Sequence, residues 1–345
     1  MVITPKRPKR RAGAGASGAI DVTVLFLECS HASTSVGPLE VFRAAGTLWN
    51  AIVATEPSPA FRVRTASIGG RPVHPDGPYA IVPDEALESV RSTDLVFVPS
   101  GGLGLDESLE RNAPVVRFLR RAHARGARIA AVCSGVALLA ASGLLDGKAA
   151  TTHWGLAEEY RARFPAVDWR PADLVTEEDG LYCGGGVYAA LDLSLYLVEK
   201  LCSRELALQC ARALLIDMPR PCQAGFAVLP MGKRHGDPAI RRAEDWIHRH
   251  CREEFRFEGL ARELGMSRRN FIRRFKAATG FPPVEYLQRL RVGAARRLLE
   301  EDAISVQEVG AAVGYEDGAF FRSLFKRHTG LAPAAYRRQF GRTAA

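Results

Sequence analysis

Two side chains suited to nucleophilic chemistry, Cys133 and His153, stand 20 residues apart in the chain. Cys133 follows the apolar segment ARIAAV and precedes a run of small and apolar residues, which predicts a buried strand turning sharply into a helix. Such a turn would present the thiol at the carboxyl edge of a sheet, as a nucleophile elbow does. The helix N-terminus beneath the thiol is expected to lower its pKa. His153, at the end of the segment ATTHW, could reach the thiol from a neighbouring strand.

Backbone amides near the thiol could complete a site for an oxyanion. The amide of Ser134 follows the thiol, and Gly101 and Gly102 end the segment DLVFVPSGG, which we predict as a neighbouring strand. A nucleophile and a base would still need a third group to orient them for hydrolysis or hydration. Glu158 and Asp192 are candidates for that group, but nothing in the sequence selects either of them.

The segments that must position these residues alternate between strand and helix patterns from residue 20 to residue 217. Short apolar runs predict strands, longer amphipathic runs predict helices, and Gly126 and Gly143 are expected to end helices. The predicted strands cover residues 20–28, 61–69, 94–102, 127–135, 150–154 and 175–185, and the predicted helices cover 35–49, 84–90, 113–126, 134–145, 188–203 and 205–217. This alternation predicts an α/β doubly wound, flavodoxin-like sheet with helices on both faces.

The segment AVCSGVALLAASGLLDGKAATTHW, residues 131–154, resembles the cysteine elbow of the ThiJ/PfpI (class I glutamine amidotransferase-like) superfamily, in the version found in GlxA-type transcription regulators. SVGPLEVFRAA resembles the first helix of that family and VPSGGLG a strand end, so the resemblance covers about residues 20–215. It implies an amidotransferase-like fold. Enzymatic members carry a carboxylate four residues before the proline of the first helix. Here Thr34 stands four residues before Pro38, so the acid is expected to be missing.

The missing acid leaves several interpretations of Cys133 open. We favour a pocket that recognises a small molecule; the others are a thiol sensitive to oxidants or electrophiles, an active hydrolase and a plain buried cysteine. The predicted pocket consists of Cys133, Ser134, Gly101, Gly102, His153 and Thr34. Because GlxA-like regulators are linked by family to nitrogenous metabolites, the resemblance implies an amino acid or an amine as the effector.

The spacing of cysteines and histidines predicts neither disulfides nor a metal site. The seven cysteines form no CxxC pair and their number is odd, which in a chain of 345 residues indicates reduced thiols. His248, His250 and Cys251 stand together, but only His248 and Cys251 could share a helix face. Because two ligands do not make a zinc site, we expect no metal, and no cofactor.

The last third of the chain contains a duplicated segment. Seven residues between Phe271 and Tyr286 recur 50 residues later, between Phe321 and Tyr336. Each copy predicts a short helix, a glycine turn and a second helix with phenylalanines on its inner face, which is a helix-turn-helix unit. Ser267 is expected to cap the second helix of the first copy. Between the copies, residues 283–301 predict a continuous helix of about 19 residues, roughly 28 Å long, which suits two helices in successive major grooves about 34 Å apart.

Residues 238–341 resemble the DNA-binding domain of the AraC/XylS family, through GMSRRNFIRRFKAATG, YLQRLRVGAARRLL and VGYEDGAFFRSLFKRHTGLAPAAYR. The resemblance places Arg269, Ile272 and Arg273 of the first unit against base edges. Arginine suits guanine O6 and N7, whereas isoleucine can contact only a thymine methyl group.

In the second unit the same resemblance places Gly318, Ala319 and Arg322 against the bases. This unit is therefore expected to recognise base edges with fewer side-chain hydrogen bonds than the first unit. Arg274 and Arg327 are expected to contact phosphates or water. The predicted DNA-binding set is Ser267, Arg268, Arg269, Ile272, Arg273, Lys276, Asp317, Gly318, Ala319, Arg322 and Lys326.

The distribution of charge supports double-stranded DNA as a partner. The chain carries a net charge of +9; residues 1–12 hold five basic residues and no acid, and residues 238–345 hold 21 basic against 13 acidic residues. A basic surplus on the repeated module favours a polyanion. Composition predicts a disordered basic tail over 1–18 and a Pro- and Gly-rich linker over 219–237. The two resemblances imply a sensor domain over 19–218 and a DNA-binding domain over 238–341.

The expected function follows from these parts. We predict a cytoplasmic transcription regulator, an activator, whose first domain senses a small-molecule effector and forms a homodimer and whose second binds DNA, with RNA polymerase as a further partner. No apolar run approaches the roughly 18 residues of a membrane span, and no signal peptide is evident. The alternative is a cysteine-dependent hydrolase, amidase or hydratase fused to a DNA-binding domain.

Overall fold

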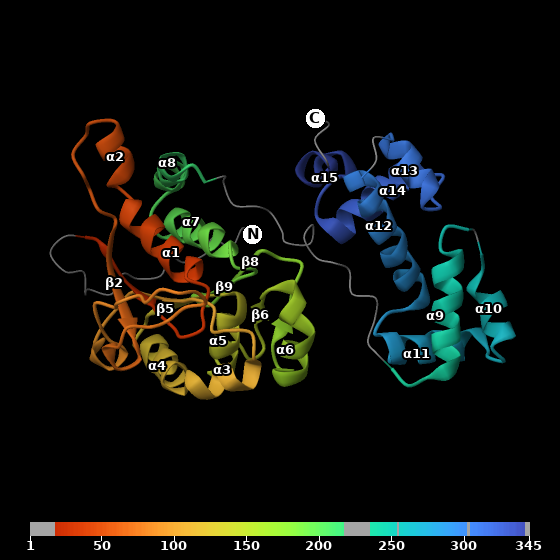
Figure 1. Cartoon of the computed structure of the whole chain (residues 1–345), viewed down its shortest axis with the longest axis horizontal. Helices are drawn as coiled ribbons and strands as arrows, with labels where there is room; N and C mark the ends of the chain where they lie inside the picture. Colours follow the sequence, from red (N-terminus) through yellow and green to blue (C-terminus); the bar gives the residue numbers. More distant parts are fainter. Residues whose placement is uncertain (1–17, 217–234, 254, 302–303, 342–345) are drawn as a thin grey trace, which may run out of the picture. The chain divides into compact units, whose positions relative to one another are not determined.

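The computed structural model describes residues 18–216, 235–253, 255–301 and 304–341. The chain divides into an α/β unit and a helical unit, each described here by itself (Figure 1). The predicted basic tail, apart from its last residue, and residues 219–234 of the predicted linker lie outside the described residues. None of the described helices is both long enough and apolar enough to cross a membrane.

The α/β unit is built on a seven-stranded sheet, whose strand order is β3-β2-β1-β4-β5-β9-β8. The strands are β1 (Ile20–Leu25), β2 (Phe61–Ser67), β3 (Glu85–Ala86), β4 (Leu95–Val98), β5 (Arg128–Val132), β8 (Val175–Glu178) and β9 (Leu181–Gly184). All neighbouring pairs are parallel except β8 and β9, which form an antiparallel hairpin at one edge. The predicted doubly wound fold is therefore confirmed, with one antiparallel edge strand.

Helices cover both faces of the sheet (Figure 1). One face carries α1 (Ser33–Ala44), α7 (Ala189–Leu201) and α8 (Arg204–Leu214), and the other carries α3 (Leu105–Arg111), α4 (Ala113–Ala124), α5 (Val136–Ala141) and α6 (Ala157–Arg163). Each face of the sheet has its own hydrophobic core. Because successive strand side chains point to opposite faces, Leu95 and Phe97 of β4 lie in the core under α1, α7 and α8, and Val96 and Val98 lie in the core under α3 to α6. Both cores hold the carboxyl ends of β4 and β5 in place.

Four predicted elements differ in the structure. The strand expected over 175–185 is two antiparallel strands, β8 and β9, because Asp179 and Gly180 adopt φ values of 51° and 77° and reverse the chain between them. The helix expected over 84–90 is wrong: β3 pairs with Ala66 and Ser67 of β2, and only one 3-10 turn (Leu87–Ser89) follows, because edge pairing outweighs a weak helical pattern. The helix expected over 35–49 ends at Ala44, and α2 (Leu48–Ile52) is separate. Gly46 has a φ of 77° in this break. Of the strand expected over 150–154, only Ala150 is in a strand, β6 (Ala149–Ala150), which pairs with β7 (Asp168–Trp169) outside the main sheet.

The helical unit contains α9 (Pro238–His250), α10 (Phe257–Glu263), α11 (Arg268–Thr279), α12 (Pro283–Glu301), α13 (Val306–Ala312), α14 (Gly318–Thr329) and α15 (Pro333–Phe340). The 19-residue helix expected between the two copies is confirmed as α12. Its buried residues Val292, Ala295 and Leu299 pack in the core of the second helix-turn-helix unit. The core of the first unit contains Ile240, Ala243 and Ile247 of α9. Each helix-turn-helix unit therefore has its own core.

Candidate nucleic-acid interface and cysteine elbow

The two copies of the repeat make the same contacts. The hydroxyl group of Thr279 donates a hydrogen bond to the carbonyl oxygen of Phe275 (2.9 Å), and that of Thr329 donates to the carbonyl oxygen of Phe325 (2.8 Å). Gly265 and Gly314, in the turns before the second helices, have φ values of 68° and 88°, which favour glycine. The predicted pair of helix-turn-helix units, α10–α11 and α13–α14, is therefore confirmed.

The second helix of each unit begins with a side-chain cap. Ser267 accepts a hydrogen bond from the amide of Asn270 (3.3 Å), as predicted. Asp317 accepts from the amides of Ala319 (2.7 Å) and Phe320 (3.1 Å), and these bonds lower the pKa of its carboxyl group. The structure thus gives both residues a capping role at the start of the predicted recognition helices.

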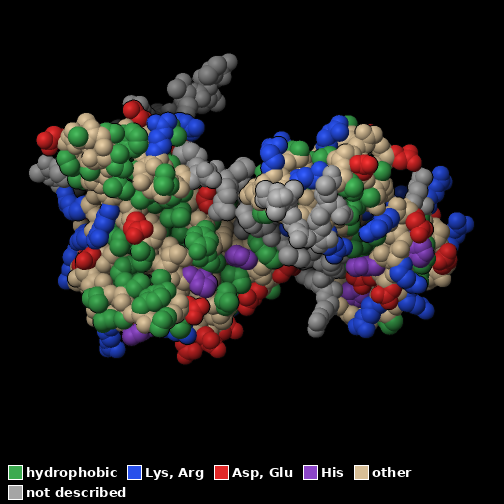
Figure 2. Space-filling view, turned by 45° about the horizontal axis from the view of Figure 1, so that its top comes forward, with side chains coloured by type: hydrophobic (Ala, Val, Ile, Leu, Met, Phe, Trp, Pro, Cys, Tyr) green, Lys and Arg blue, Asp and Glu red, His purple; other side chains and the backbone are tan. Residues whose placement is uncertain are grey.

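Four residues of the predicted DNA-binding set form one exposed stripe on α11: Arg269, Ile272, Arg273 and Lys276. Their spacing of three and four residues places them on the same helix face. The Ile272 side chain is 37% exposed, although burial would be favourable for it. Basic side chains recur over the visible face of the helical unit (Figure 2). The arrangement suits insertion of this helix face into a major groove.

Other basic residues of α11 have partners within the helical unit. Arg268 forms an ion pair with Glu258 of α10, with 3.0 Å between Nε and Oε1. Arg273 donates a hydrogen bond to the Asn270 side chain (2.9 Å) and remains exposed. Arg273 is therefore held in place by a neutral partner, whereas Arg268 must leave a carboxylate to reach DNA.

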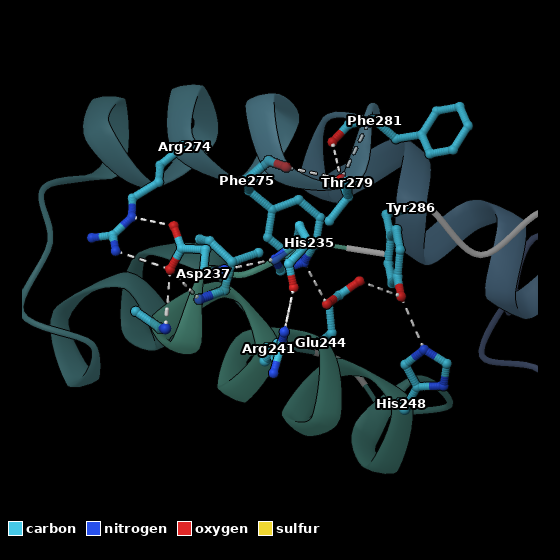
Figure 3. A network of polar contacts seen from close by, with 12 residues as sticks. His235, Asp237, Arg241, Glu244, His248, Arg274, Phe275, Thr279, Phe281 and Tyr286 are labelled. Atoms are coloured by element: carbon cyan, nitrogen blue, oxygen red, sulfur yellow. Dashed lines mark hydrogen bonds and ion pairs between the residues drawn. The ribbon is translucent and has the colours of Figure 1, made fainter. Parts of the chain in front are cut away.

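Arg274 has a different role in the structure from the one predicted. Its guanidinium group forms two hydrogen bonds to the carboxylate of Asp237, from Nε to Oδ2 (2.5 Å) and from Nη2 to Oδ1 (2.9 Å), as Figure 3 shows. The same carboxylate caps α9 through the amides of Ala239 and Ile240. Arg274 was expected to contact phosphate or water, but the structure uses it to join α11 to the start of α9.

A chain of polar contacts continues from this junction along α9 (Figure 3). His235 Nε2 lies 2.8 Å from Glu244, the hydroxyl group of Tyr286 donates to Glu244 (3.0 Å), and His248 contacts the same hydroxyl group (3.0 Å). His248, considered above as a metal ligand, thus binds tyrosine. Among the residues that the structure describes, no group of three or more His, Cys, Asp or Glu side chains could hold a metal ion.

On α14, Ala319, Arg322 and Lys326 are exposed and Gly318 is half-buried. Three further exposed residues of this helix, Phe320, Ser323 and Arg327, are not in the predicted DNA-binding set; Phe320 is 45% exposed. The repeat offset of 50 residues aligns Ser323 with Arg273, and that signal was available in the sequence.

In the α/β unit, Cys133 has the backbone strain of a nucleophile elbow. It follows β5 directly and has a φ of 55°, in the left-handed region that residues other than glycine rarely adopt. Its carbonyl oxygen accepts a hydrogen bond from Thr152 (2.8 Å), and that of Ser134 accepts one from Tyr160 (3.3 Å). A side chain at Gly135 would lie 1.9 Å from the carbonyl oxygen of Pro99, so only glycine fits the turn. The predicted elbow is confirmed.

The prediction of a lowered thiol pKa is wrong. Burial raises the pKa of Cys133 from 9.0 to about 11, and the hydrogen bond from the Ser134 amide only partly offsets this effect. The side chain is 3% exposed, and a thiolate there would lose nearly all its hydration. Cys133 is therefore a neutral thiol near pH 7.

The Gly101 amide, which was predicted to bind an oxyanion, has a side-chain partner in the structure. The Gly101 amide donates to the hydroxyl group of Ser134 (3.0 Å). Thr34 lies beside this pair and is fully buried; its hydroxyl group contacts the Ser100 hydroxyl group (3.1 Å) and accepts from the Ser100 amide (3.1 Å). The structure thus brings Thr34, Gly101 and Ser134 together next to Cys133, with hydroxyl groups in place of an acid.

His153 is placed less favourably for catalysis. Its Nδ1 accepts a hydrogen bond from the Gly155 amide (3.1 Å), and burial lowers its pKa. Within the described ranges no hydrogen bond joins His153 to Cys133. Gly102, with a φ of 95°, lies against the segment after β1, where an added side chain would meet the carbonyl oxygen of Cys29 at 3.5 Å.

Family models match both units: residues 22–200 match the DJ-1/PfpI family, and residues 260–339 match a helix-turn-helix domain. The chain belongs to the DJ-1/PfpI family. Its second unit is an AraC-type helix-turn-helix region, so this DJ-1/PfpI chain is an AraC-family DNA-binding transcriptional regulator.

Named relatives agree with this assignment. The chain is 30% identical to the HTH-type transcriptional regulator GlxA of Rhizobium meliloti over 84% of this chain and 91% of GlxA. It is 28% identical to the regulator GbdR of Pseudomonas aeruginosa over 79% of this chain and 74% of GbdR. A crystal structure of a ThiJ/PfpI family protein from Pseudomonas syringae shares the fold, with a TM-score of 0.51 and 24% identity, covering 70% of this chain and 94% of that one.

One partial relative of this DJ-1/PfpI chain is an enzyme. An isonitrile hydratase of Pseudomonas putida is 31% identical over 166 residues, which cover 46% of this chain and 70% of the hydratase.

Proposed function

We propose that the α/β unit is a non-catalytic sensor of a small metabolite that controls DNA binding by the helical unit. The state of Cys133 carries this proposal. Its thiol is neutral near pH 7, and Thr34 stands where the resemblance to enzymatic members predicts an acid. A nucleophile without a thiolate, a paired base or an acid lacks the means of attack, whereas the same hydroxyl and thiol groups can bind a ligand.

The effector proposed is a small amine or amino acid. Glu28 and Asp76 lie at the end of the unit where Thr34 and Ser100 meet: the segment after β1 holds His31, whose amide donates to Ser100 (2.8 Å). The Asp76 amide binds the carbonyl oxygen of Ser30 in the same segment (2.8 Å). The half-buried Glu28 carboxylate, which accepts a hydrogen bond from the His74 amide (2.9 Å), and the exposed Asp76 carboxylate would favour an ammonium group over an anion.

The α/β unit is also proposed to form the homodimer. Helix α2 and the residue that follows it expose three large apolar side chains, Leu48 (37%), Ile52 (59%) and Val53 (44%). Neighbouring exposed apolar side chains favour a protein interface. Changing Ile52 to glutamate should shift the full chain toward the monomer in sedimentation, and an unchanged state would exclude α2 as the interface.

DNA is proposed to meet α11 through Arg269, Ile272 and Arg273, and α14 through Ala319 and Arg322. The remaining members of the predicted set would contact phosphates or cap the helices. Arg273→Ala is expected to relax base preference at one position, by about 1–3 kcal/mol of discrimination. Lys326→Ala should weaken binding to all DNA sequences alike and reduce the slope of log affinity against log salt concentration by about 1. Unchanged affinity in both variants, measured by anisotropy on a selected duplex, would contradict this docking.

The sensor is tested with the full chain and its Cys133→Ala variant. Thermal-shift screening against small amines and amino acids should identify a ligand that raises the melting temperature by mass action. The variant should keep its DNA affinity and change only its ligand response. Failure of every amine and amino acid to shift the melting temperature would count against this effector class.

An enzyme is the second candidate, because the isonitrile hydratase relative matches the α/β part of the chain. The expected result is no turnover of an alkyl isonitrile by the full chain. Turnover that disappears in Cys133→Ala would establish catalysis and overturn the non-catalytic sensor.

A further inference from the structure

A hollow of about 330 Å³ opens at the amino edge of the sheet, between α4 and the connection that leads into β4. Ala127, which lines it, immediately precedes β5, whereas Cys133 immediately follows this strand. A five-residue strand is roughly 16 Å long, so the hollow and the cysteine elbow lie at opposite ends of β5. The hollow is therefore separate from the proposed sensor pocket.

The floor of the hollow is apolar. Four of its lining side chains belong to buried residues, namely Val90 (7% exposed), Phe118 (4%), Ala122 (7%) and Ala127 (5%). Phe118 and Ala122 lie one turn apart on the inner face of α4, so the floor is part of the packed core. A floor of this kind favours the apolar body of a ligand over bulk water.

The rim of the hollow is cationic. Arg91, Arg121 and Arg125 line it together with a single acid, Glu88. None of the three arginines forms an ion pair with any residue that the structure describes. Arg125 donates a hydrogen bond from Nη1 to the carbonyl oxygen of Arg91 (3.2 Å), which holds its guanidinium group near the connection into β4.

We propose that this hollow binds a small amphipathic carboxylate. Guanidinium groups pair with carboxylates through parallel hydrogen bonds, and the apolar floor accommodates a hydrocarbon tail. The volume admits on the order of ten non-hydrogen atoms, taking about 30 Å³ for each as for water. The three arginines against one acid exclude organic cations by charge, in contrast to the amine proposed for the other edge of the sheet.

Octanoate, which has ten non-hydrogen atoms, is the probe, and octylammonium is its charge-reversed control. Calorimetric titration of the full chain should give a dissociation constant of about 0.1–1 mM for octanoate and no heat of binding for octylammonium. Arg121→Glu and Arg125→Glu should each weaken octanoate binding at least tenfold. Arg117→Glu, on an exposed position of the same helix outside the hollow, should change it less than about twofold.

Two further variants locate the ligand. Ala122→Leu should block binding by filling the floor while it leaves every arginine in place, and its melting temperature shows whether the unit still folds. Cys133→Ala should bind octanoate as the unaltered chain does. Absence of octanoate binding at about 5 mM, equal binding of octylammonium, unchanged affinity in both arginine variants, or loss of binding in Cys133→Ala would each overturn the assignment. None of these outcomes bears on the amine sensor, which is tested by its own ligand.

Discussion

The carboxylate of Asp237 serves both α9 and Arg274: it caps the first helix of the helical unit and forms a two-point ion pair with the first recognition helix. Asp237 stands at the end of the predicted linker, and Arg274 follows Arg273, a proposed base-reading residue. A displacement of the chain just before α9 would therefore be transmitted to α11. This pair offers a physical route by which the linker can affect DNA reading.

Separate substitutions divide the two roles of Asp237. Asp237→Ala should lose the cap and the ion pair and lower the free energy of unfolding by at least about 1 kcal/mol, the usual value of a cap. Asp237→Asn keeps an oxygen acceptor for the cap and should retain part of this stability. Asp245→Ala, exposed on the same helix, is the control and should have little effect. Urea unfolding of the full chain measures the free energy of unfolding of all three variants. Equal losses in Asp237→Ala and Asp237→Asn would show that the cap does not contribute to stability.

The same pair predicts a dependence on acid. The Arg274 guanidinium group lowers the pKa of Asp237 below its ordinary value of 3.8. The stability contributed by the charged carboxylate is therefore fully present above pH 4 or so and is lost as the pH falls through the lower pKa of the folded state. Comparing the unaltered chain with Asp237→Asn during acid titration should show this loss only in the unaltered chain.

Cys133 should react slowly with alkylating reagents at neutral pH. Because its pKa is raised to about 11, the thiolate fraction and hence the rate should keep rising between pH 8 and pH 11 or so. The exposed Cys29 should react first. Peptide mapping after iodoacetamide treatment at a series of pH values measures both sites, and rapid modification of Cys133 near pH 6 would reveal the thiolate of a working nucleophile.

Gly135→Ala should disrupt the elbow. The new methyl carbon would lie 1.9 Å from the Pro99 carbonyl oxygen, which belongs to the backbone and cannot rotate away. We expect a loss at the upper end of the about 1–3 kcal/mol typical of overpacking. Gly259→Ala in α10, where the added carbon would meet no atom within 4 Å apart from its chain neighbours and the backbone of its own helix, should instead stabilise the helical unit by up to about 1 kcal/mol. Calorimetry distinguishes the two, and a stable Gly135→Ala variant would disprove this close packing.

Arg291 should be a structural residue of α12. It is 9% exposed and donates hydrogen bonds to the carbonyl oxygens of Cys251 (2.6 Å), Glu253 (2.8 Å) and Gly314 (2.9 Å). Hydrogen bonds to charged groups contribute about 1.5–3 kcal/mol each and do not add fully, so Arg291→Ala should cost about 3 kcal/mol or more of stability. Arg297→Ala, exposed on the same helix, should change stability little in the same urea titration, and equal losses would refute the role of Arg291.

The local features of this protein could be predicted because neighbours in sequence decide them. The Ser267 cap and the turn glycines are set by residues within one or two turns, and Cys133 follows a recognisable strand-turn-helix pattern. The 50-residue repeat is found because its two copies can be compared directly. The helix predicted over 84–90 was wrong because its partner, β2, lies almost 20 residues earlier. Ser323 was omitted although the repeat aligns it with Arg273.

The sequence by itself determined the two-unit architecture, the doubled helix-turn-helix and the position of the elbow, since periodicity and turn chemistry are local properties and the repeat is found by comparing the two copies directly. Only the tertiary structure decided how the charged and polar groups are used. It raised the pKa of Cys133 by burial, directed the Gly101 amide to Ser134, and paired Arg274 with Asp237, 37 residues away. Burial and long-range hydrogen bonds depend on which segments meet in space, and no window of sequence contains both partners.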